Sequence, residues 1–309
     1  DLDKATAYVS DDLMYRHWDH TVLEIPHTFI ADFSFGGAEI TPENSVDILA
    51  GESELYELPT EPFGGLEQLS WSPDSRFIAY SCRKLVGKKY AFSTNTDIYI
   101  YNVKTGECAR VECSANGYDT DPVWRPDGKY LAWISMERDG YEADKQRLMV
   151  TEIEAGADGK VVIGTPVDAT ADFKYNVSGP VWTEDSKGIY FAALAEGIQG
   201  IFEAVEGAEG WHVRRLTAED SWYDFGSPFH VVSGEDSEIT LYATWCSMDF
   251  PTELVAVKYS DNGVEYTPVT HENDHILSQL AEHETEARWL DTVDGKKMLT
   301  WVLYPPQFD

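Results

Sequence analysis

WSPDSRFIAY, at residues 71–80, is the first clear copy of a pattern that recurs along the chain. It returns as WRPDGKYLAW at residues 124–133 and as WTEDSKGIYF at residues 182–191. A degenerate fourth copy runs from His230 to Asp236 and is followed by ITLY at residues 239–242. The copies begin 53, 58 and 48 residues apart, which is the period of a structural repeat.

Each copy describes two strands joined by a tight turn. In the Pro-Asp-Gly and Pro-Asp-Ser turns, Pro presets φ, Asp hydrogen-bonds to nearby backbone, and the small residue accepts a positive φ. Pro122, Pro180 and Pro228 precede the Trp or His position by two residues, where a strand tolerates Pro. Two more strands follow, as in residues 97–103 and 107–111. Four strands in about 50 residues, repeated without helices, predict an all-β fold, a β-propeller of four-stranded antiparallel blades. We expect Trp71, Trp124 and Trp182 to be buried between blades.

The two ends of the chain depart from this repeat. Residues 15–49 are interpreted as one further unit, with a strand at residues 27–33 and a turn at Gly36-Gly37. Near the other end, strands at residues 286–290 and 298–304 flank Asp294-Gly295, a strong hairpin signal. Residues 275–284 form a short helix or a linker before that hairpin. We therefore predict a propeller over residues 1–280, incomplete at its N-terminus, and a separate segment over residues 281–309.

Composition excludes some functions. The chain has 55 acidic and 23 basic residues, a formal charge of −32, which disfavours nucleic acid as a partner. The acidity is compatible with solubility alone and with a negative interior that attracts the protonated amines of peptides. No apolar run approaches the roughly 20 residues of a membrane helix. The four cysteines form no zinc pattern, and Cys108 and Cys113 are predicted to point to opposite faces of a strand.

Three segments are more specific than the repeat, which by itself resembles the PD40 or TolB-like blades of several bacterial proteins. MYRHWD at residues 14–19, STNTDIY at residues 93–99 and MERDGYEADK at residues 136–145 resemble the prolyl oligopeptidase (S9) family of serine peptidases. The branch they resemble is that of dipeptidyl-peptidase 5 and acylaminoacyl-peptidase. The closing segment, from ARW at residues 287–289 to WVLYPP at residues 301–306, is similar to that family's entry into an α/β-hydrolase domain.

This resemblance implies a propeller of seven or eight blades that caps the hydrolase and admits short peptides, whereas the chain has room for about six units. It further implies a periplasmic or secreted protein without a cofactor, whose partner is a hydrolase domain of the same protein. The sequence contains neither the G-x-S-x-G nucleophile elbow nor an HGGG-type oxyanion segment. The family's Ser, Asp and His would follow Asp309, so we expect the chain alone to have no peptidase activity.

The candidate substrate-binding residues are Arg138, Tyr141, Glu142 and Asp144, in the polar insertion after the strand at residues 131–136. Glu142 or Asp144 would hold the free amine of a substrate. The alternative is an exposed loop in which Arg138 pairs with a carboxylate and contributes little energy.

Metal binding is not predicted. His17, Asp19 and His20 lack a further ligand for zinc, and Asp119 and Asp121 lack the spacing of a calcium loop. Arg16 and Trp18 are expected at a seam between blades.

The leading functional hypothesis is a non-catalytic domain that gates and orients substrates of a serine exopeptidase. One alternative is a stand-alone TolB-like propeller that binds proteins, although such a propeller has no use for the closing hairpin. Another is a propeller glycosidase or lyase with paired carboxylates in the central channel.

Overall fold

The computed structural model of the chain describes residues 4, 6–7, 9–33, 36, 44–61, 64–113, 116–156, 159–219, 222–233, 238–260, 262–281 and 283–308. Strands dominate these residues, and the α-helices among them are two short ones, α1 (Gly87–Phe92) and α2 (Asp274–Leu277). The predicted all-β class is therefore confirmed. None of the helices in the described ranges has the length and apolar character needed to span a membrane. The chain divides into two compact units, residues 1–168 (unit 1) and 169–309 (unit 2).

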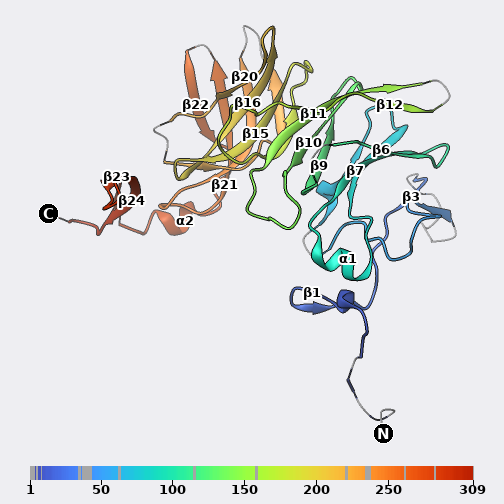
Figure 1. Cartoon of the computed structure of the whole chain (residues 1–309). Helices are drawn as coiled ribbons and strands as arrows, with labels where there is room; N and C mark the ends of the chain where they lie inside the picture. Colours follow the sequence, from blue (N-terminus) through green and yellow to red (C-terminus); the bar gives the residue numbers. More distant parts are fainter. Residues whose placement is uncertain are drawn as a thin grey trace. The chain divides into compact units, whose positions relative to one another are not determined.

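Unit 1 contains two larger antiparallel sheets (Figure 1). The first has the order β5-β6-β7-β8, with β5 (Leu69–Trp71), β6 (Phe77–Cys82), β7 (Asp97–Asn102) and β8 (Cys108–Arg110). The second has the order β9-β10-β11-β12, with β9 (Asp119–Trp124), β10 (Tyr130–Ser135), β11 (Arg147–Ala155) and β12 (Val161–Ile163). A further strand, β13 (Val167–Asp168), pairs with β11. Both sheets run in sequence order, as predicted for consecutive repeats.

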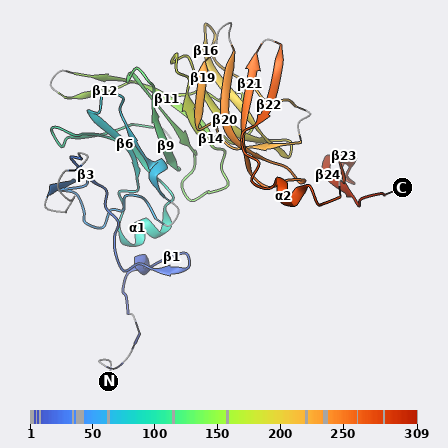
Figure 2. The ribbon, with the colours of Figure 1, turned by 180° about the vertical axis from the view of Figure 1, so that it is seen from behind.

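Unit 2 contains two sheets of the same kind, in which neighbouring strands lie side by side (Figure 2). One is built from β14 (Ser178–Trp182), β15 (Gly188–Ala195), β16 (Ile198–Gly207) and β17 (Gly210–Arg215). The other is built from β18 (Asp224–Phe225), β19 (His230–Ser233), β20 (Ile239–Cys246), β21 (Glu253–Ser260) and β22 (Gly263–Pro268), and both β18 and β19 pair with β20. Four repeats are thus seen as separate antiparallel sheets in the described residues. That they close into a propeller stays a prediction.

The repeated turns have one geometry. After each of the three repeat tryptophans, the next residue donates its backbone N–H to the carbonyl oxygen of the residue that begins the following strand. These bonds, from Ser72 to Phe77, Arg125 to Tyr130 and Thr183 to Gly188, are 2.8–2.9 Å long. The small residue of each turn has a positive φ of 58°, 71° or 63°, at Ser75, Gly128 and Ser186 respectively. The turn chemistry predicted from the sequence is therefore confirmed.

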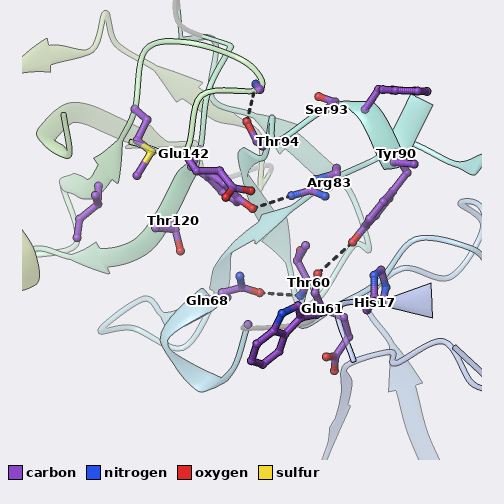
Figure 3. Close-up of a pocket in the computed structure, with 18 of the residues that line it drawn as sticks. His17, Thr60, Glu61, Gln68, Arg83, Tyr90, Ser93, Thr94, Thr120 and Glu142 are labelled. Atoms are coloured by element: carbon purple, nitrogen blue, oxygen red, sulfur yellow. Dashed lines mark hydrogen bonds between the residues drawn. The ribbon is translucent and has the colours of Figure 1, made fainter. Parts of the chain in front are cut away.

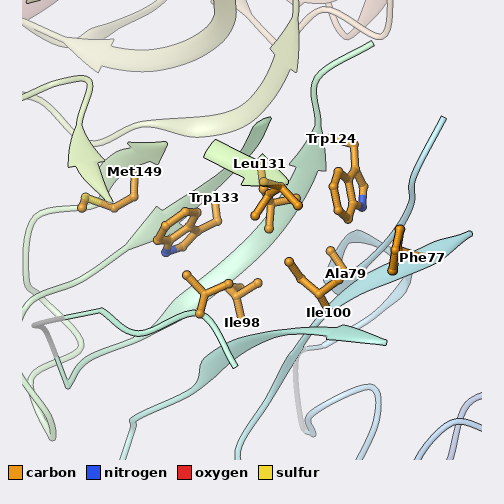
Figure 4. Close-up of a cluster of buried hydrophobic side chains, with 10 residues drawn as sticks. Phe77, Ala79, Ile98, Ile100, Trp124, Leu131, Trp133 and Met149 are labelled. Carbon is orange, nitrogen blue, oxygen red and sulfur yellow. The ribbon is translucent and has the colours of Figure 1, made fainter. Parts of the chain in front are cut away.

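The core of unit 1 lies between its two sheets (Figure 4). Trp124, Leu131 and Trp133 of the second sheet face apolar side chains of the first, including Phe77 and Ile100. The Trp124 ring stacks on Phe77 with a centroid separation of 6.3 Å, and its indole N–H donates to the backbone oxygen of Ser70 at 3.2 Å. Trp124 thereby fastens the second sheet of unit 1 to the first.

The prediction that all three tryptophans are buried is wrong for Trp71. Trp124 and Trp182 are 7% and 6% exposed, but Trp71 is 52% exposed. Trp71 occupies the same place in its hairpin, opposite Ile78, as Trp124 does opposite Leu131. The strands that precede it, β3 (Phe29–Ala31) and β4 (Ser45–Asp47), form a pair of only three residues each. Residues of both strands line one cavity together with Trp71, so this pair does not pack closely over the ring. Burial of the Trp therefore depends on the neighbouring strands and not on the motif alone.

The fourth copy also differs in detail. His230 pairs with Tyr242 and is the first residue of β19, whereas each Trp is the last residue of its strand. The hairpin is therefore present, but His230 is not at the Trp position. Most of its turn, residues 234–237, lies outside the described residues.

At the N-terminal side, β1 (Arg16–His17) pairs with β2 (His20–Thr21), and β3 pairs with β4. Gly36 has the positive φ of a turn residue, while Gly37 lies outside the described residues. The C-terminal hairpin is confirmed: β23 (Glu284–Asp291) pairs along its length with β24 (Lys297–Tyr304), and Gly295 has φ 76°. The predicted helix or linker before it contains α2. A domain boundary near residue 280 stays a prediction.

Candidate functional site

A cavity of about 1080 Å³ opens among loops of unit 1 (Figure 3). It lies at the end of the two sheets that is opposite the repeated turns, because its walls come from the β6–β7 loop and the β10–β11 loop. Further lining residues come from β1 and the turn after it, from η4 (Leu66–Gln68) and the residues just before it, and from β9. The cavity is therefore formed by the connecting loops, which differ from one repeat to the next, and not by the repeated turns.

All three segments that resemble the peptidase family reach this cavity. Residues 14–19, 93–99 and 136–145 each contribute to its lining. The last two are joined directly, since Ser93 Oγ and Thr94 N both donate to Asp139 Oδ1 at 2.8 Å, and Gly140 N donates to Thr94 Oγ1 at 2.8 Å. Sequence reasoning identified the segments separately but did not predict that they meet.

Three of the four candidate residues hold the shape of the β10–β11 loop. Arg138 and Asp144 form an ion pair at 2.9 Å, and Asp144 also accepts hydrogen bonds from the backbone N–H of Glu137 and Arg138. The Arg138 side chain holds the pKa of Asp144 at about 2, well below the usual range. The guanidinium lies 3.9 Å from the centroid of the Tyr141 ring. The predicted alternative, an arginine paired with a carboxylate in an exposed loop, therefore describes Arg138 and Asp144.

Glu142 differs from its neighbours. It lines the cavity and is exposed, and among the described residues its carboxylate has no hydrogen-bond or ion-pair partner. Its negative charge is consequently available to a ligand. Of the four candidates, Glu142 alone lines the cavity, although its role in substrate binding stays a prediction.

Arg16 and Trp18 were expected at a seam between blades, and the structure does not place them at one. The Trp18 side chain is 72% exposed and lines the cavity, and Arg16 Nε donates to the backbone oxygen of Trp18 at 2.6 Å. Trp18 has φ 42°, which fits the tight turn between the two-residue strands β1 and β2. So short a hairpin cannot bury a large ring.

Buried polar groups connect the wall to the core. His17 Nε2 lies 2.5 Å from Glu57 Oε1, and the hydroxyl of Tyr90 donates to the other oxygen of Glu57. All three residues are at most 7% exposed. Burial and the Glu57 carboxylate raise the pKa of Tyr90 far above its usual value, so this hydroxyl remains a donor.

Helix α1 is anchored by the hydrogen bonds among His17, Glu57 and Tyr90. Gly87, with φ 56°, begins the helix, and the preceding Val86 provides no side-chain cap. The six residues GKKYAF would not form a stable helix alone. Burial of the Tyr90 ring and its bond to Glu57 hold the helix in place. Sequence reasoning missed this element because it lacks the usual capping signals.

One strained residue also borders the cavity. Asp121 has φ 52° at a bulge in β9, and the equivalent bulge in β14 of unit 2 has Gly179 with φ 53°. Each is followed by Pro in the sequence, so the two positions correspond. An aspartate in this conformation costs about 1 kcal/mol that glycine avoids. Burial raises the pKa of the Asp121 carboxyl. Because Asp121 has a strained backbone and lines the cavity, it is a candidate functional residue. Comparison of the repeats, which have Asp121 and Gly179 at the same position, could have identified it from the sequence.

The lining carries both signs of charge. Carboxylates come from Glu61, Glu67, Asp121 and Glu142, and cations from Arg16 and Arg83. Within the described ranges, no group of three or more His, Cys, Asp or Glu side chains is arranged to hold a metal ion. The cavity can therefore attract a molecule that carries both an amine and an acceptor group.

Comparison with known proteins gives relatives over the whole chain. The chain is 42% identical over 310 residues to dipeptidyl-peptidase 5 of Porphyromonas gingivalis and 39% identical over 309 residues to that of Porphyromonas endodontalis. Both matches cover 100% of this chain and 41% of the relative, so the chain spans about two-fifths of the length of these curated proteins. No family model matches the chain. Among solved structures, oligopeptidase B from Trypanosoma brucei matches 87% of this chain and 35% of its own, with a TM-score of 0.49 and 14% identity.

Proposed function

We propose that the chain is a member of the dipeptidyl-peptidase 5 branch of the prolyl oligopeptidase (S9) family of serine peptidases. In that family it would be a non-catalytic domain that orients short peptides for a hydrolase domain of the same protein. In this proposal the sheets form part of a propeller, and the cavity of unit 1 contacts the amino-terminal part of the substrate. The periplasmic or secreted location expected from the resemblance is part of the same proposal.

One observation carries the proposal. The three segments that resemble the family, separated in the sequence by 73 and 36 residues, line a single cavity. The core between the sheets takes Ile98 from the second segment, but the residues with which the segments line the cavity, such as Ser93, Thr94 and Glu142, are outside that core. Packing of the core therefore does not require this convergence. The segments therefore fit a shared role at the cavity.

The chemistry of the lining suits a peptide amine. A protonated amine is attracted by the unpaired carboxylate of Glu142, and charge-assisted hydrogen bonds are about twice as strong as neutral ones. Asp121 offers a second carboxylate on the same lining. The 309 residues contain no G-x-S-x-G motif, so in this proposal the nucleophile and the oxyanion donors come from the hydrolase domain.

Equilibrium binding to the purified chain tests the role of the cavity. We expect the tripeptide Ala-Ala-Ala to bind more tightly than its N-acetylated form, and Glu142→Gln to weaken binding of the free-amine peptide about tenfold, equivalent to ~1.4 kcal/mol. Binding of the acetylated peptide should change little. Glu154→Gln is the matched control, since Glu154 is an exposed carboxylate on β11 that does not line the cavity. Equal affinity for both peptides, unaffected by Glu142→Gln, would contradict the proposed amine site.

Activity gives an independent test. The purified chain should neither hydrolyse dipeptidyl or acyl-aminoacyl chromogenic substrates nor react with a fluorophosphonate probe. Stoichiometric labelling of a serine would show that the chain has its own nucleophile, and the non-catalytic role would be wrong.

A further inference from the structure

Arg83 is an unusual member of the cavity lining. It follows β6 directly and is 8% exposed, and it is the only Lys or Arg among the buried side chains of the described ranges. Its guanidinium lies 4.5 Å from the centroid of the Tyr90 ring and 5.6 Å from that of Tyr118. Two aromatic rings thus hold a positive charge in a fixed place at the wall of the cavity.

The hydrogen-bond donors of Arg83 are mostly unused. A guanidinium has five N–H donors, and here Nη2 donates to the hydroxyl of Tyr118 at 3.1 Å, while Nε is buried without a partner. No carboxylate of the described residues forms an ion pair with Arg83, in contrast to Arg138 and Arg214. The buried carboxylate of Glu57 is already engaged by His17 and Tyr90.

A second unpaired group borders the same cavity. Thr60 Oγ1 is buried without a hydrogen-bond partner. Buried polar atoms are paired in the great majority of cases, and an unpaired one costs about 1–3 kcal/mol. Arg83 can only donate and the Thr60 hydroxyl can donate as well, so a ligand group with acceptor oxygens satisfies both.

From these observations we infer that Arg83 binds a carboxylate group of a short peptide, either its free C-terminus or the side chain of an acidic residue. A carboxylate matches the planar donors of a guanidinium. A phosphate group fits less well, because four carboxylates line the same cavity and repel a dianion. A peptide with one amine and one carboxylate matches the two-signed lining. The inference rests on the proposed function for the identity of the ligand as a peptide.

Blocked dipeptides separate this inference from amine recognition. The probes are N-acetyl-Ala-Ala, with a free terminal carboxylate, N-acetyl-Glu-Ala-amide, with only a side-chain carboxylate, and the uncharged N-acetyl-Ala-Ala-amide. Their dissociation constants for the full chain are measured by isothermal titration calorimetry. We expect at least one carboxylate probe to bind ten or more times more tightly than the uncharged amide. Which of the two binds identifies the source of the carboxylate.

Substitutions locate the effect. Arg83→Met should abolish the preference for the carboxylate probe, and Arg83→Lys, which keeps the charge and the buried stem, should weaken it several-fold. Arg76→Met is the control, because Arg76 is exposed, paired with Asp74 and outside the cavity lining. If Arg83→Met does not fold, the comparison of probes on the wild-type chain and on Arg83→Lys remains decisive.

Three outcomes overturn the inference: equal binding of all probes, no binding of either carboxylate probe, or a preference that survives Arg83→Met. Its failure is distinct from failure of the proposed function. If the wild-type chain shows no carboxylate preference but still depends on a free amine, only the inference is rejected. A carboxylate preference without any amine dependence rejects only the proposed amine site.

Discussion

The two ends of the sheets in unit 1 differ in how regular their connections are. At one end, the turns after Trp71 and Trp124 have the same length, the same closing hydrogen bond and a positive φ at the same position. At the other end, the β6–β7 loop contains a helix and the β10–β11 loop contains an ion-paired insertion, whereas the corresponding β15–β16 connection in unit 2 is only Glu196-Gly197. The repeated end determines the fold, and the variable end of unit 1 forms the cavity.

The largest expected effect concerns the tryptophans of the repeated end. Trp124→Ala should lower the free energy of unfolding of unit 1 by about 3–5 kcal/mol, because it removes a buried ring that joins two sheets. Trp71→Ala should cost less than about 1 kcal/mol, since that ring is half exposed. Urea denaturation of both variants measures the difference. Equal losses would mean that Trp71 is covered in solution.

The next effect concerns Asp119, at the loop end of β9. Asp119 is 3% exposed, accepts a hydrogen bond from the indole of Trp133 at 3.0 Å, and its pKa is raised by burial to about 7. The native state therefore binds a proton between pH 4 and pH 7 that the unfolded state releases, so this group lowers stability as the pH rises through that range.

Asp119→Asn should remove that part of the pH dependence while keeping an acceptor for Trp133. We expect the variant to be more stable than the wild type at pH 8, by an amount on the order of a few kcal/mol, and to show a smaller difference at pH 4. Denaturation curves at several pH values measure this. A wild-type pH profile that is unchanged by the substitution would show that Asp119 ionises normally.

The smallest effect concerns the turns. Gly128→Ala should cost about 1 kcal/mol because alanine is strained at φ 71°. Ser75→Gly, at the equivalent position with φ 58°, should leave stability unchanged or slightly improve it, since glycine tolerates that conformation. Thermal unfolding of both variants provides the comparison. Destabilisation by Ser75→Gly as large as that by Gly128→Ala would show that the turns are not equivalent.

The turns and strands of the repeated end could be predicted from the sequence because the residues that determine them are close together in the chain. Pro, Asp and Gly define a turn within five residues, and alternation along residues 77–80 or 130–133 defines the strand that follows. The C-terminal hairpin was predicted on the same basis. Burial of Trp71 was predicted wrongly, because burial depends on the neighbouring strands, which a local motif does not describe.

The cavity could not be predicted from the sequence and was identified only in the structure. The β10–β11 loop was identified by resemblance, but the free charge of Glu142 and the use of Asp144 within the loop depend on side-chain geometry. Arg83 and Tyr90 carry no motif, and their importance comes from contacts with residues 17, 57 and 118, which are distant in sequence. The strained conformation of Asp121 could have been suspected from its alignment with Gly179 in the repeat.

Hydrogen–deuterium exchange of the chain with a short free peptide, followed by mass spectrometry, tests whether the variable end of unit 1 contacts substrate. With Ala-Ala-Ala near saturation and without turnover, we predict slower exchange in residues 14–19, 83–96 and 136–146. Exchange in the repeated turns at residues 72–76 and 125–129 should be unchanged. Protection at those turns, or no protection in the three cavity segments while the peptide is bound, would contradict the proposed role of the cavity.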